Sequence, residues 1–588
     1  MILQALYGYY ERLREHGSVP SLGFAFKNVG FALVLTPKGD LVDIVDLRSA
    51  DGSKTIPKKM IIPFCNEVGA RASNIQPNFL VDKAGYILGV DLKTKAKRLE
   101  EMHVAYKQLV EKVAEGVHDP ALYAVLAFLS RWDPSQIPSF IKLDEVAADG
   151  SGWLTFQIDG DLEYIHERSA VQHAWTRYFL SPKTDSSEGF CLISGKNAVI
   201  QRLHAQFTGI PGAQSSGALL VSFNDESHQS FNKKQGANAP SSLEAEFRAS
   251  TALKFLMSKE SSQKVLIGDS NNTVFLTIFW AERDSPAEEL FGIALDPRVA
   301  SGDDQRIRLF LQALRDGKMP MDLDAEMDPD VRFFILGLSP NKSRLSVRFW
   351  QSGTVGNIYE KIGQHFRDLS IERTGERDPE FPSVALLTLE TAPLRKRNKM
   401  QLRDFKDVPS HLSGAFARAI LQGTPYPKSL LAQVIMRIRA DQEINYLRAS
   451  LIKAYLARVH RIHKKDMEVG MTLNTSSTNA GYRLGRLFAA LEKAQSDAVP
   501  GANSTIKDRF YGSASATPRV VFPQLLRLAQ HHIAKSDYGR ATDKKIEEIL
   551  SGIDAFPAHL SLEDQGFFAL GYYHQRNSFF PRKDKEDN

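Results

Sequence analysis

The sequence VRFFILGLSPNKSRLSVRFW, Val331 to Trp350, decides the fold class of this chain of 588 residues. Two apolar runs flank the turn residues Pro340 and Asn341, and this pattern predicts a β-hairpin. A helical pattern follows at once over Asn357–Leu369. A hairpin followed directly by a helix is typical of α+β folds, in which each element buries its apolar face against another.

The same mixture of strand and helix signals continues toward the N-terminus. A helix is predicted over 1–15 and a hairpin over 31–48, FALVLTPKGDLVDIVDLR, with its turn at Pro37 to Asp40. The pair His118-Asp119, followed by Pro120, predicts the N-terminal cap of a helix. Further helices are predicted over 93–115 and 119–132, strands at Ile61–Ile62, Tyr86–Val90, 153–158 and 218–223, and another hairpin over 265–280 with its turn at 269–272.

Strand signals stop near residue 395, and helical patterns replace them. These patterns cover 411–422, 428–440, 443–462, 479–496, 518–535, 543–553 and 562–575. The sequence therefore predicts an α+β protein. Its N-terminal domain, 1–395, is a mixed, β-rich region of hairpins and helices with room for two subdomains, and its C-terminal domain, 396–588, is an all-α helical bundle.

The composition is that of a globular protein in a reducing compartment. Hydrophobic residues make up 43% of the chain, and Cys65 and Cys191 are its only two cysteines. So few cysteines argue against a disulfide framework. No secretory signal and no run of about 18 apolar residues is present. We therefore expect a cytoplasmic protein that has no membrane partner.

Positive charge is concentrated in one region. Residues 395–465 contain sixteen Lys and Arg against four Asp and Glu, a balance of +12 in a chain whose net charge is +5. Such asymmetry predicts an anionic partner, although a solvated helical face is the simpler alternative. The candidates for binding backbone phosphates are Arg395, Lys396, Arg397, Lys399, Arg437, Arg439 and Lys453.

Motifs for catalysis are weak throughout. Gly212 to Gly217 has the spacing of a Walker A loop, but Ala218 and Leu219 stand where that motif needs Lys and Ser or Thr. His460 and His463 are three residues apart, without a carboxylate or thiol partner along the helix. No G-x-S-x-G motif occurs. We expect no enzymatic activity, no cofactor and no metal.

Two polar segments are better candidates for binding. One, Lys58 to Asn78, offers Lys58, Lys59, Arg71, Ser73, Asn74, Gln76 and Asn78. Amide and hydroxyl side chains can read base edges, and Lys and Arg can hold phosphates, whereas an ordinary polar loop is the alternative. The other, Gly209 to Ser242, is rich in Gly, Ser, Asn and Gln. It offers Gln214, Ser215, Ser216, Asn224, Lys233, Lys234, Gln235 and Asn238.

Several long segments resemble one family. They include MILQALYGYYERL, FALVLTPKGDLVDIVDLR, NIQPNFLVDKAGYILG, GAQSSGALLVSFNDESHQSFNKKQGANAPSS, QGTPYPKSLLAQVIMRIRAD and LNTSSTNAGYRLGRLFAALEKAQ. Together they run in order from the first residues to beyond residue 530. The chain resembles the Csd family, the Cas-eight-type large subunit of the type I-C CRISPR surveillance complex, Cascade.

The resemblance implies a non-catalytic subunit that binds nucleic acid. Such a subunit recognises the protospacer-adjacent motif in double-stranded target DNA and promotes unwinding and R-loop formation. It holds the non-target strand and helps to recruit the helicase-nuclease. The implied partners are the CRISPR guide RNA, the target DNA, the helicase-nuclease, and the backbone, handle-end and small subunits of Cascade.

Within this scheme, each group of candidate residues receives a role. Those of 58–78 would contact the motif duplex, those of 209–242 the separating strands or the guide, and those of 395–465 the phosphates of displaced DNA. The resemblance also implies that the C-terminal part, 467–588 or 471–588, is made separately as a small subunit from Met467 or Met471. Two alternatives stay open: an RNA-processing endoribonuclease of the same system, and a scaffold without direct DNA contact.

Overall fold

The computed structural model divides the chain into two compact units. The first contains Met1–Ser261 together with Asn341–Leu345, and the second contains Ser262–Pro340 and Ser346–Asn588. The structure describes residues 1–51, 54–64, 75–92, 94–141, 143–146, 153–181, 187–210, 212–268, 273–297, 305–318, 327–375, 377–397, 400–409, 411–465 and 469–580. Sheets and helices are mixed in the early part and helices make up most of the late part, so the predicted α+β class is confirmed.

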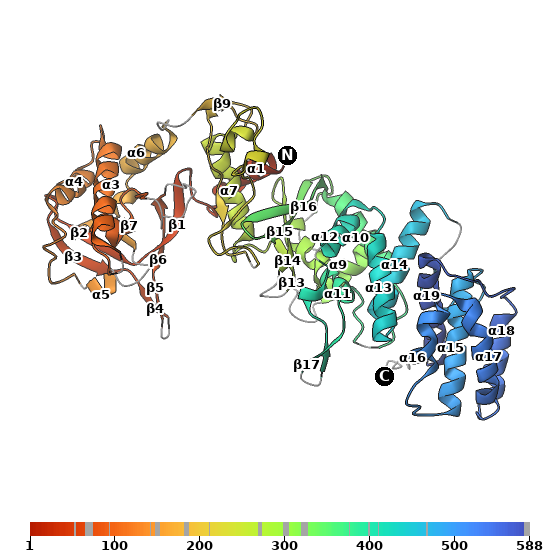
Figure 1. Ribbon diagram of the computed structural model, residues 1–588. Coiled ribbons are helices and arrows are strands. Elements are labelled where there is room, and N and C mark those ends of the chain that lie inside the picture. The colour runs from red at the N-terminus through yellow and green to blue at the C-terminus, as the bar shows by residue number, and fades with distance from the viewer. Residues whose placement is uncertain are drawn as a thin grey trace. The chain divides into compact units, whose positions relative to one another are not determined.

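A four-stranded sheet lies at the centre of the early part of the first unit (Figure 1). Its order is β3-β2-β8-β7, with β2 and β3 antiparallel and β2 and β8 parallel. Every residue of β2 is buried, which is why the run Phe31–Leu35 is continuously apolar. The sheet contains β2 (Phe31–Leu35), β3 (Leu41–Asp46), β7 (Asp82–Lys83) and β8 (Trp153–Ile158).

Two-stranded ribbons make up most of the other β-structure of this unit. They pair β1 (Phe24–Val29) with β6 (Lys58–Pro63), β4 (Ser49–Asp51) with β5 (Lys54–Ile56), and β9 (Glu188–Phe190) with β10 (Asn197–Val199). The strand β11 (Gln206–Phe207) pairs with β12 (Ala218–Leu219). The first of these ribbons carries Lys58 and Lys59, two of the predicted binding residues.

Helices of the first unit pack on these strands and on each other. They are α1 (Ile2–Glu15), α2 (Ala84–Ile87), α3 (Ala96–Ala114), α4 (Pro120–Arg131), α5 (Leu143–Val146), α6 (Ser169–Leu180) and α7 (Leu243–Met257). The predicted cap of α4 is confirmed, because the Asp119 carboxylate accepts hydrogen bonds from the backbone of Ala121 and Leu122. Pro120 then occupies the first turn, where no amide proton is needed.

The second unit begins with the hairpin strands that the sequence predicts. The strands β16-β15-β14-β13 lie in this order, and the side chains of Phe275, Phe279, Phe333, Ile335 and Phe349 enter one core. The strands are β13 (Lys264–Gly268), β14 (Thr273–Ala281), β15 (Arg332–Asn341) and β16 (Arg344–Thr354). The tip of the β15–β16 hairpin belongs to the first unit.

Helices fill the remainder of the second unit and share that core. They are α8 (Ala287–Leu295), α9 (Gln305–Arg315), α10 (Val355–Leu369), α11 (Val384–Leu389), α12 (Leu412–Gln422), α13 (Lys428–Asp441), α14 (Tyr446–Ile462), α15 (Ala480–Ala498), α16 (Ile506–Ala514), α17 (Pro518–Ile533), α18 (Gly539–Leu550) and α19 (Leu562–Phe579). The backbones of α15 and α19 pack closely because Gly485 and Gly571 have no β-carbon. A β-carbon at Gly485 would collide with the Phe568 carbonyl oxygen, and one at Gly571 with that of Tyr482.

Three predicted boundaries differ from the structure. Tyr86–Val90 is not a strand: Ala84–Ile87 is a buried helical turn, since a short apolar run has no period that separates strand from helix. The strand predicted over 218–223 contains only Ala218–Leu219. The compact units divide at Ser261, not at residue 395, and a short ribbon of β17 (Arg395–Arg397) and β18 (Met400–Leu402) follows that position.

Candidate nucleic-acid interface

The segment Gly209–Ser242, described apart from residue 211, forms a polar surface of the first unit that we call the loop platform. Its strand β12 pairs with β11 on one side and with Arg344 on the other. The side chains of Gln214, Ser215 and Ser216 are exposed before the strand, as are all residues from Asn224 to Lys234 after it. The platform therefore presents hydroxyl, amide and ammonium groups to solvent from two neighbouring loops.

The tip of the β15–β16 hairpin holds the platform from one side. The Gln214 amide donates to the Lys342 carbonyl oxygen at 3.0 Å, and the Leu219 amide donates to that of Ser343 at 2.9 Å. The Arg344 guanidinium donates to Asn224 Oδ1 at 2.6 Å and lies 3.3 Å from His228 Nδ1. These contacts join both loops of the platform to one short, well-defined turn.

Asn238 fastens the second loop from inside. Its side-chain oxygen accepts a hydrogen bond of 2.9 Å from the Ser230 amide. Its side-chain nitrogen donates to the carbonyl oxygens of Lys233 and Gln235 at 2.9 and 3.0 Å. One amide side chain thus satisfies three backbone groups and closes residues 230–238 into a compact loop.

A glycine attaches the same loop to the chain near residue 202. The Gly236 amide donates to the Arg202 carbonyl oxygen at 2.9 Å, and a β-carbon at this position would collide with the carbonyl oxygens of Gln201 and Arg202. The Arg202 guanidinium also donates to Gln235 Oε1 at 3.2 Å. Glycine is therefore required here for the close approach of two backbones.

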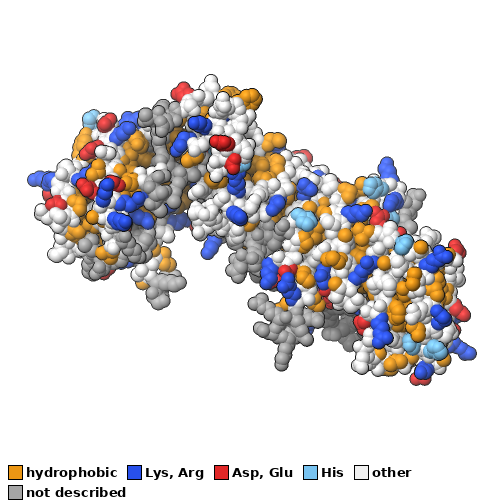
Figure 2. Space-filling view, in the orientation of Figure 1, with side chains coloured by type: hydrophobic (Ala, Val, Ile, Leu, Met, Phe, Trp, Pro, Cys, Tyr) orange, Lys and Arg blue, Asp and Glu red, His pale blue; other side chains and the backbone are white. Residues whose placement is uncertain are grey.

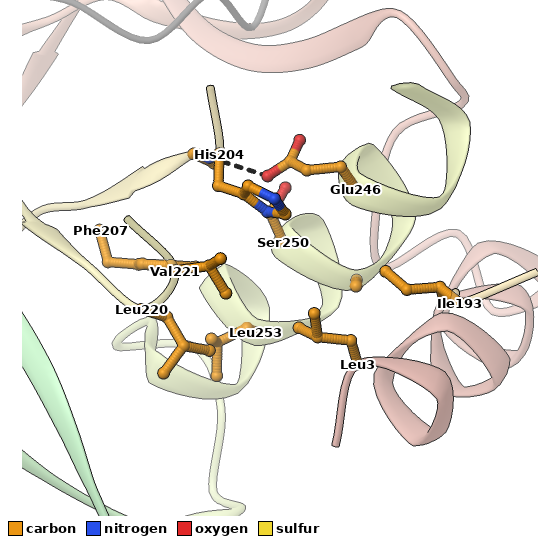
Figure 3. Close-up of a pocket in the computed structure, with 11 residues that line it drawn as sticks. Leu3, Ile193, His204, Phe207, Leu220, Val221, Glu246, Ser250 and Leu253 are labelled. Atoms are coloured by element: carbon orange, nitrogen blue, oxygen red, sulfur yellow. Dashed lines mark hydrogen bonds between the residues drawn. The ribbon is translucent and has the colours of Figure 1, made fainter. Parts of the chain in front are cut away.

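A small pocket lies under the platform (Figure 3). His204, Glu246 and Ser250 gather at one end of it, and Leu3, Leu220 and Leu253 at the other. The space that the centre of a water molecule can reach is about 20 Å³, which is room for one or two waters. A pocket of this size is too small to receive a ligand, and the residues that line it support the platform.

Two titratable groups border this pocket, and burial changes the pKa of both. Burial lowers the pKa of His204 to about 4, against the opposing effect of a hydrogen bond with the Ala239 backbone. Burial also raises the pKa of Glu246, although its carboxylate accepts a hydrogen bond of 2.8 Å from the Ala205 amide. The imidazole is therefore neutral at physiological pH, and its buried Nε2 has no hydrogen-bond partner among the described residues.

The structure brings the eight predicted platform residues together on one segment. Gln214, Ser215, Ser216, Asn224, Lys233 and Lys234 are exposed. Gln235 and Asn238 are partly buried and have structural roles, because their side chains hold the loop in shape. Six of the eight side chains therefore face solvent, and the other two fix their arrangement.

Three lysines of the β1–β6 ribbon lie over aromatic rings. The ammonium of Lys27 lies 4.5 Å from the ring centroid of Phe64, that of Lys58 lies 4.8 Å from Tyr164, and that of Lys59 lies 4.7 Å from Phe26. Lys59 also forms an ion pair of 2.7 Å with Glu260. Contacts of this kind orient a flexible side chain, so the ribbon presents ordered positive charge.

The other predicted motif readers divide into two groups. Arg71, Ser73 and Asn74 lie outside the described residues. The backbone amide of Gln76 donates a hydrogen bond of 3.2 Å to the Tyr86 hydroxyl. Asn78 is buried, with 2% of its surface exposed, and both its backbone and its side-chain nitrogen donate to Asp82. The structure does not support a reader role for Asn78, because its amide faces the protein interior.

The basic region 395–465 uses much of its charge inside the second unit. Arg448 is fully buried between the carboxylates of Glu390 and Asp441, and Arg458 is fully buried against Asp368 at 2.9 Å. Burial by itself would raise the pKa of Asp368. The hydrogen bonds from Arg461 and the charge of Arg458 outweigh this effect, so the pKa of Asp368 lies below its ordinary value. Arg448 and Arg458 stabilise the packing of α14 and are not available to a ligand.

Most of the described residues that were predicted to bind phosphates also contact other groups of the protein. Lys453 is buried and donates to the Arg367 carbonyl oxygen at 2.9 Å, and burial lowers its pKa to about 8. Arg437 pairs with Asp441, and Arg439 donates to Gln565 at 2.8 Å. Arg395 is 60% exposed and pairs with Asp407. Lys399 and the side chains of Lys396 and Arg397 lie outside the described residues.

The structure therefore corrects the choice of cations in this region. Lys453 cannot meet a phosphate at the surface, and Arg437 and Arg439 serve internal contacts. Exposed cations of the same region include Arg418, Lys428 and Lys464. On the visible face of the helical part, Lys and Arg side chains are scattered among hydrophobic and uncharged ones (Figure 2).

His460, one of the two histidines considered as metal ligands, packs in the protein interior. His460 is buried and its ring lies 5.5 Å from that of Phe567. In the part of the chain that the structure describes, no group of three or more His, Cys, Asp or Glu side chains is arranged to hold a metal ion. None of the helices described there has the length and apolarity needed to cross a membrane.

Sequence reasoning missed four residues of the interface. Arg344 lies 120 residues from Asn224 and Arg202 lies 33 residues from Gln235 along the chain, so no local pattern links these pairs. Lys27 belongs to the strand Phe24–Val29, which was not predicted, although part of its partner strand was, at Ile61–Ile62. Phe231 carried a signal that was available: it is an aromatic residue inside a polar loop and stands two residues before Lys233-Lys234.

Comparisons with known proteins agree with the resemblance. No curated protein matches the chain. The family model described as CRISPR-associated protein (Cas_Csd1) matches residues 6–580, which is nearly the whole chain. The chain therefore belongs to the Csd1 family of CRISPR-associated proteins.

Proposed function

We propose that this chain is the non-catalytic large subunit of a type I-C CRISPR RNA-guided surveillance complex. It recognises the protospacer-adjacent motif in duplex DNA, promotes unwinding and R-loop formation, holds the non-target strand and helps to recruit the helicase-nuclease. Its partners are the guide RNA, the target DNA and the other Cascade subunits. Membership of a CRISPR-associated family supports the general assignment.

The observation that carries the proposal is the exposed and braced loop platform. In guide-dependent recognition, base pairing reads most of the sequence, so the protein needs only a few polar readers and positive charge for the backbone. The platform supplies Gln214, Ser215, Ser216 and Asn224 as donors and acceptors, and Lys233 and Lys234 as cations. Its three attachments keep these groups in place before the ligand arrives, which reduces the entropic cost of binding.

The β1–β6 ribbon is the second supporting feature. In the sequence, Lys58 and Lys59 come shortly before Arg71, Ser73 and Asn74. Ordered ammonium groups can bind the phosphates that flank a short motif, while amides read the base edges. The motif contact is therefore assigned to Lys58, Lys59, Arg71, Ser73, Asn74 and Gln76.

Contact with the displaced strand requires exposed cations. Arg395 remains a candidate, and Arg418, Lys428 and Lys464 replace the buried Lys453. Because such contacts release counterions, affinity for all targets falls with salt in proportion to the number of phosphates bound.

Binding of a duplex by the assembled complex, with and without this chain, tests the proposal. We expect motif-dependent binding only when the chain is present. The double variant Lys59→Gln, Asn74→Ala should lose discrimination between good and bad motifs, whereas Lys97→Gln, an exposed lysine of α3, should not.

Two other results would overturn the proposal. Cleavage of a repeat RNA by the purified chain would support an endoribonuclease. Salt-insensitive assembly of the complex without any crosslink between this chain and DNA would support a scaffold.

A further inference from the structure

Phe231 is the most unusual residue of the loop platform. It is 92% exposed, although a phenyl ring is among the side chains that gain most from burial. Its backbone φ of 53° lies in the left-handed region, as does that of Asn232 at 57°. A bulky residue rarely adopts this conformation, and strain of this kind persists only where the surrounding structure enforces it.

The surrounding structure does enforce it. Asn238 bonds the Ser230 amide on one side of Phe231 and the Lys233 carbonyl oxygen on the other. Arg344 holds the start of the loop at Asn224, and Gly236 attaches its end to Arg202. The ring therefore projects from a loop that is fixed at both ends and across its middle.

The charges nearest to the ring along the chain are positive. Lys233 and Lys234 follow it at two and three residues and are exposed, and the acidic pair Asp225-Glu226 lies five and six residues before it. Asp225 is occupied in a local turn, where its carboxylate accepts a hydrogen bond from the Ser227 amide at 3.0 Å. An exposed aromatic ring followed by two ammonium groups is suited to a stacked base and its adjacent phosphates.

We infer that Phe231 stacks on an unpaired nucleobase, with Lys233 and Lys234 binding the phosphates next to that base. The inference rests on the proposed function and deepens it, because it names the residue that holds a base once the duplex has opened. Stacking on one face requires no hydrogen bond to the base, so the contact is insensitive to base identity. The unpaired base can come from target DNA or from the guide RNA, and the two sources are distinguishable.

Substitutions that vary the ring test the inference in the assembled complex. Phe231→Ala and Phe231→Leu should weaken binding of target DNA, or assembly on guide RNA, about tenfold, since one stacked base contributes on this order. Phe231→Trp should restore binding, because it keeps an aromatic face. Phe190→Ala is the matched control, since Phe190 is 56% exposed on β9 of the same unit.

A photoreactive p-benzoylphenylalanine at position 231 identifies the source of the base. A crosslink to labelled target DNA or to labelled guide RNA supports the inference and names the strand. A crosslink only to another protein subunit overturns it. So does a Leu variant that binds as well as the Trp variant, because an apolar protein contact needs no ring, and so does an Ala variant that binds both nucleic acids as the unmodified chain does.

A different measurement tests the proposed function. Motif-dependent duplex binding by the unmodified complex decides that proposal, whatever the Phe231 variants do. Because Phe231 packs against almost nothing, these substitutions should leave folding unchanged, and a native unfolding curve for each variant confirms it.

Discussion

The guanidinium of Arg344 donates a hydrogen bond of 2.6 Å to the side-chain oxygen of Asn224, which lies 120 residues earlier in the chain. This bond joins the turn of a β-hairpin to the loop platform. It explains how a loop of small polar residues, which would otherwise sample many conformations, keeps one shape.

Arg344→Ala should loosen the loop platform without unfolding the unit. Removal of one hydrogen bond from a charged donor costs about 1.5 kcal/mol at most for an exposed pair, so protection of amides 222–230 against hydrogen exchange should fall by up to about tenfold. Arg332→Ala, on the preceding strand of the same hairpin, is the control, since Arg332 pairs with Glu282 instead. Equal protection in both variants would show that Arg344 does not brace the loop.

Asn238→Asp should distinguish the acceptor function of the Asn238 side chain from its donor function. An aspartate can still accept from the Ser230 amide, but it cannot donate to the carbonyl oxygens of Lys233 and Gln235 and places negative charge beside them. We therefore expect Asn238→Asp to disorder 231–236 at least as much as Asn238→Ala does. Hydrogen exchange over this segment measures the effect; a protected segment in the Asp variant would contradict the donor role.

Lys428→Gln and Lys464→Gln should each reduce the salt dependence of target binding by about one counterion, because one phosphate contact is lost. Lys453→Met should leave that slope unchanged, since the Lys453 ammonium is buried and bound to the Arg367 carbonyl oxygen. Affinity measured across a range of salt concentrations distinguishes the variants. A reduced slope for Lys453→Met alone would return this residue to the phosphate-binding set.

His204 should make the protein less stable in acid. Its pKa is about 4 when folded, below the ordinary 6.5, so the unfolded chain binds a proton between these values and the folded chain does not. Stability is therefore lost as pH falls from about 6.5 to 4, by up to about 3 kcal/mol from this group.

The variant His204→Leu isolates that contribution. The difference in unfolding free energy between the unmodified chain and His204→Leu, measured at each pH, should change over this interval. His173→Gln, an exposed position on α6, serves as the control. A pH-independent difference would mean that the imidazole is already charged in the folded state.

Regular elements with a clear period were predictable from local sequence. The helix α1, the hairpin β2–β3, the strand β8 and the capped helix α4 lie where the patterns place them, because each buries one face or one continuous run. The strand predicted at Tyr86–Val90 overlaps the buried helical turn Ala84–Ile87, since so short an apolar run cannot show a period. The exposed side chains of the loop platform were also predictable, because they are small, polar and rich in turn-forming types.

Charge could not be placed from sequence in the same way. The excess of +12 over 395–465 predicted a basic surface, but Arg448 and Arg458 are buried with carboxylates that include Glu390 and Asp368, which lie outside that window. Burying an arginine is tolerable only when such partners surround it. Whether a cation faces solvent or a carboxylate is decided by contacts between residues far apart in the chain.

The sequence alone determined that this chain is an α+β protein with a helical C-terminal part, and its peculiar segments identified its family. Both properties are carried by local patterns, which persist whatever the distant contacts are. Only the tertiary structure decided which polar residues act as binders and which as supports. Asn78, Gln235, Asn238 and Lys453 resemble ligands in sequence, but their hydrogen bonds close loops and cores. The exposed Phe231 resembles a core residue, but the hydrogen bonds of Asn238 within its loop and the contacts of that loop with Arg344 and Arg202 hold it in solvent instead.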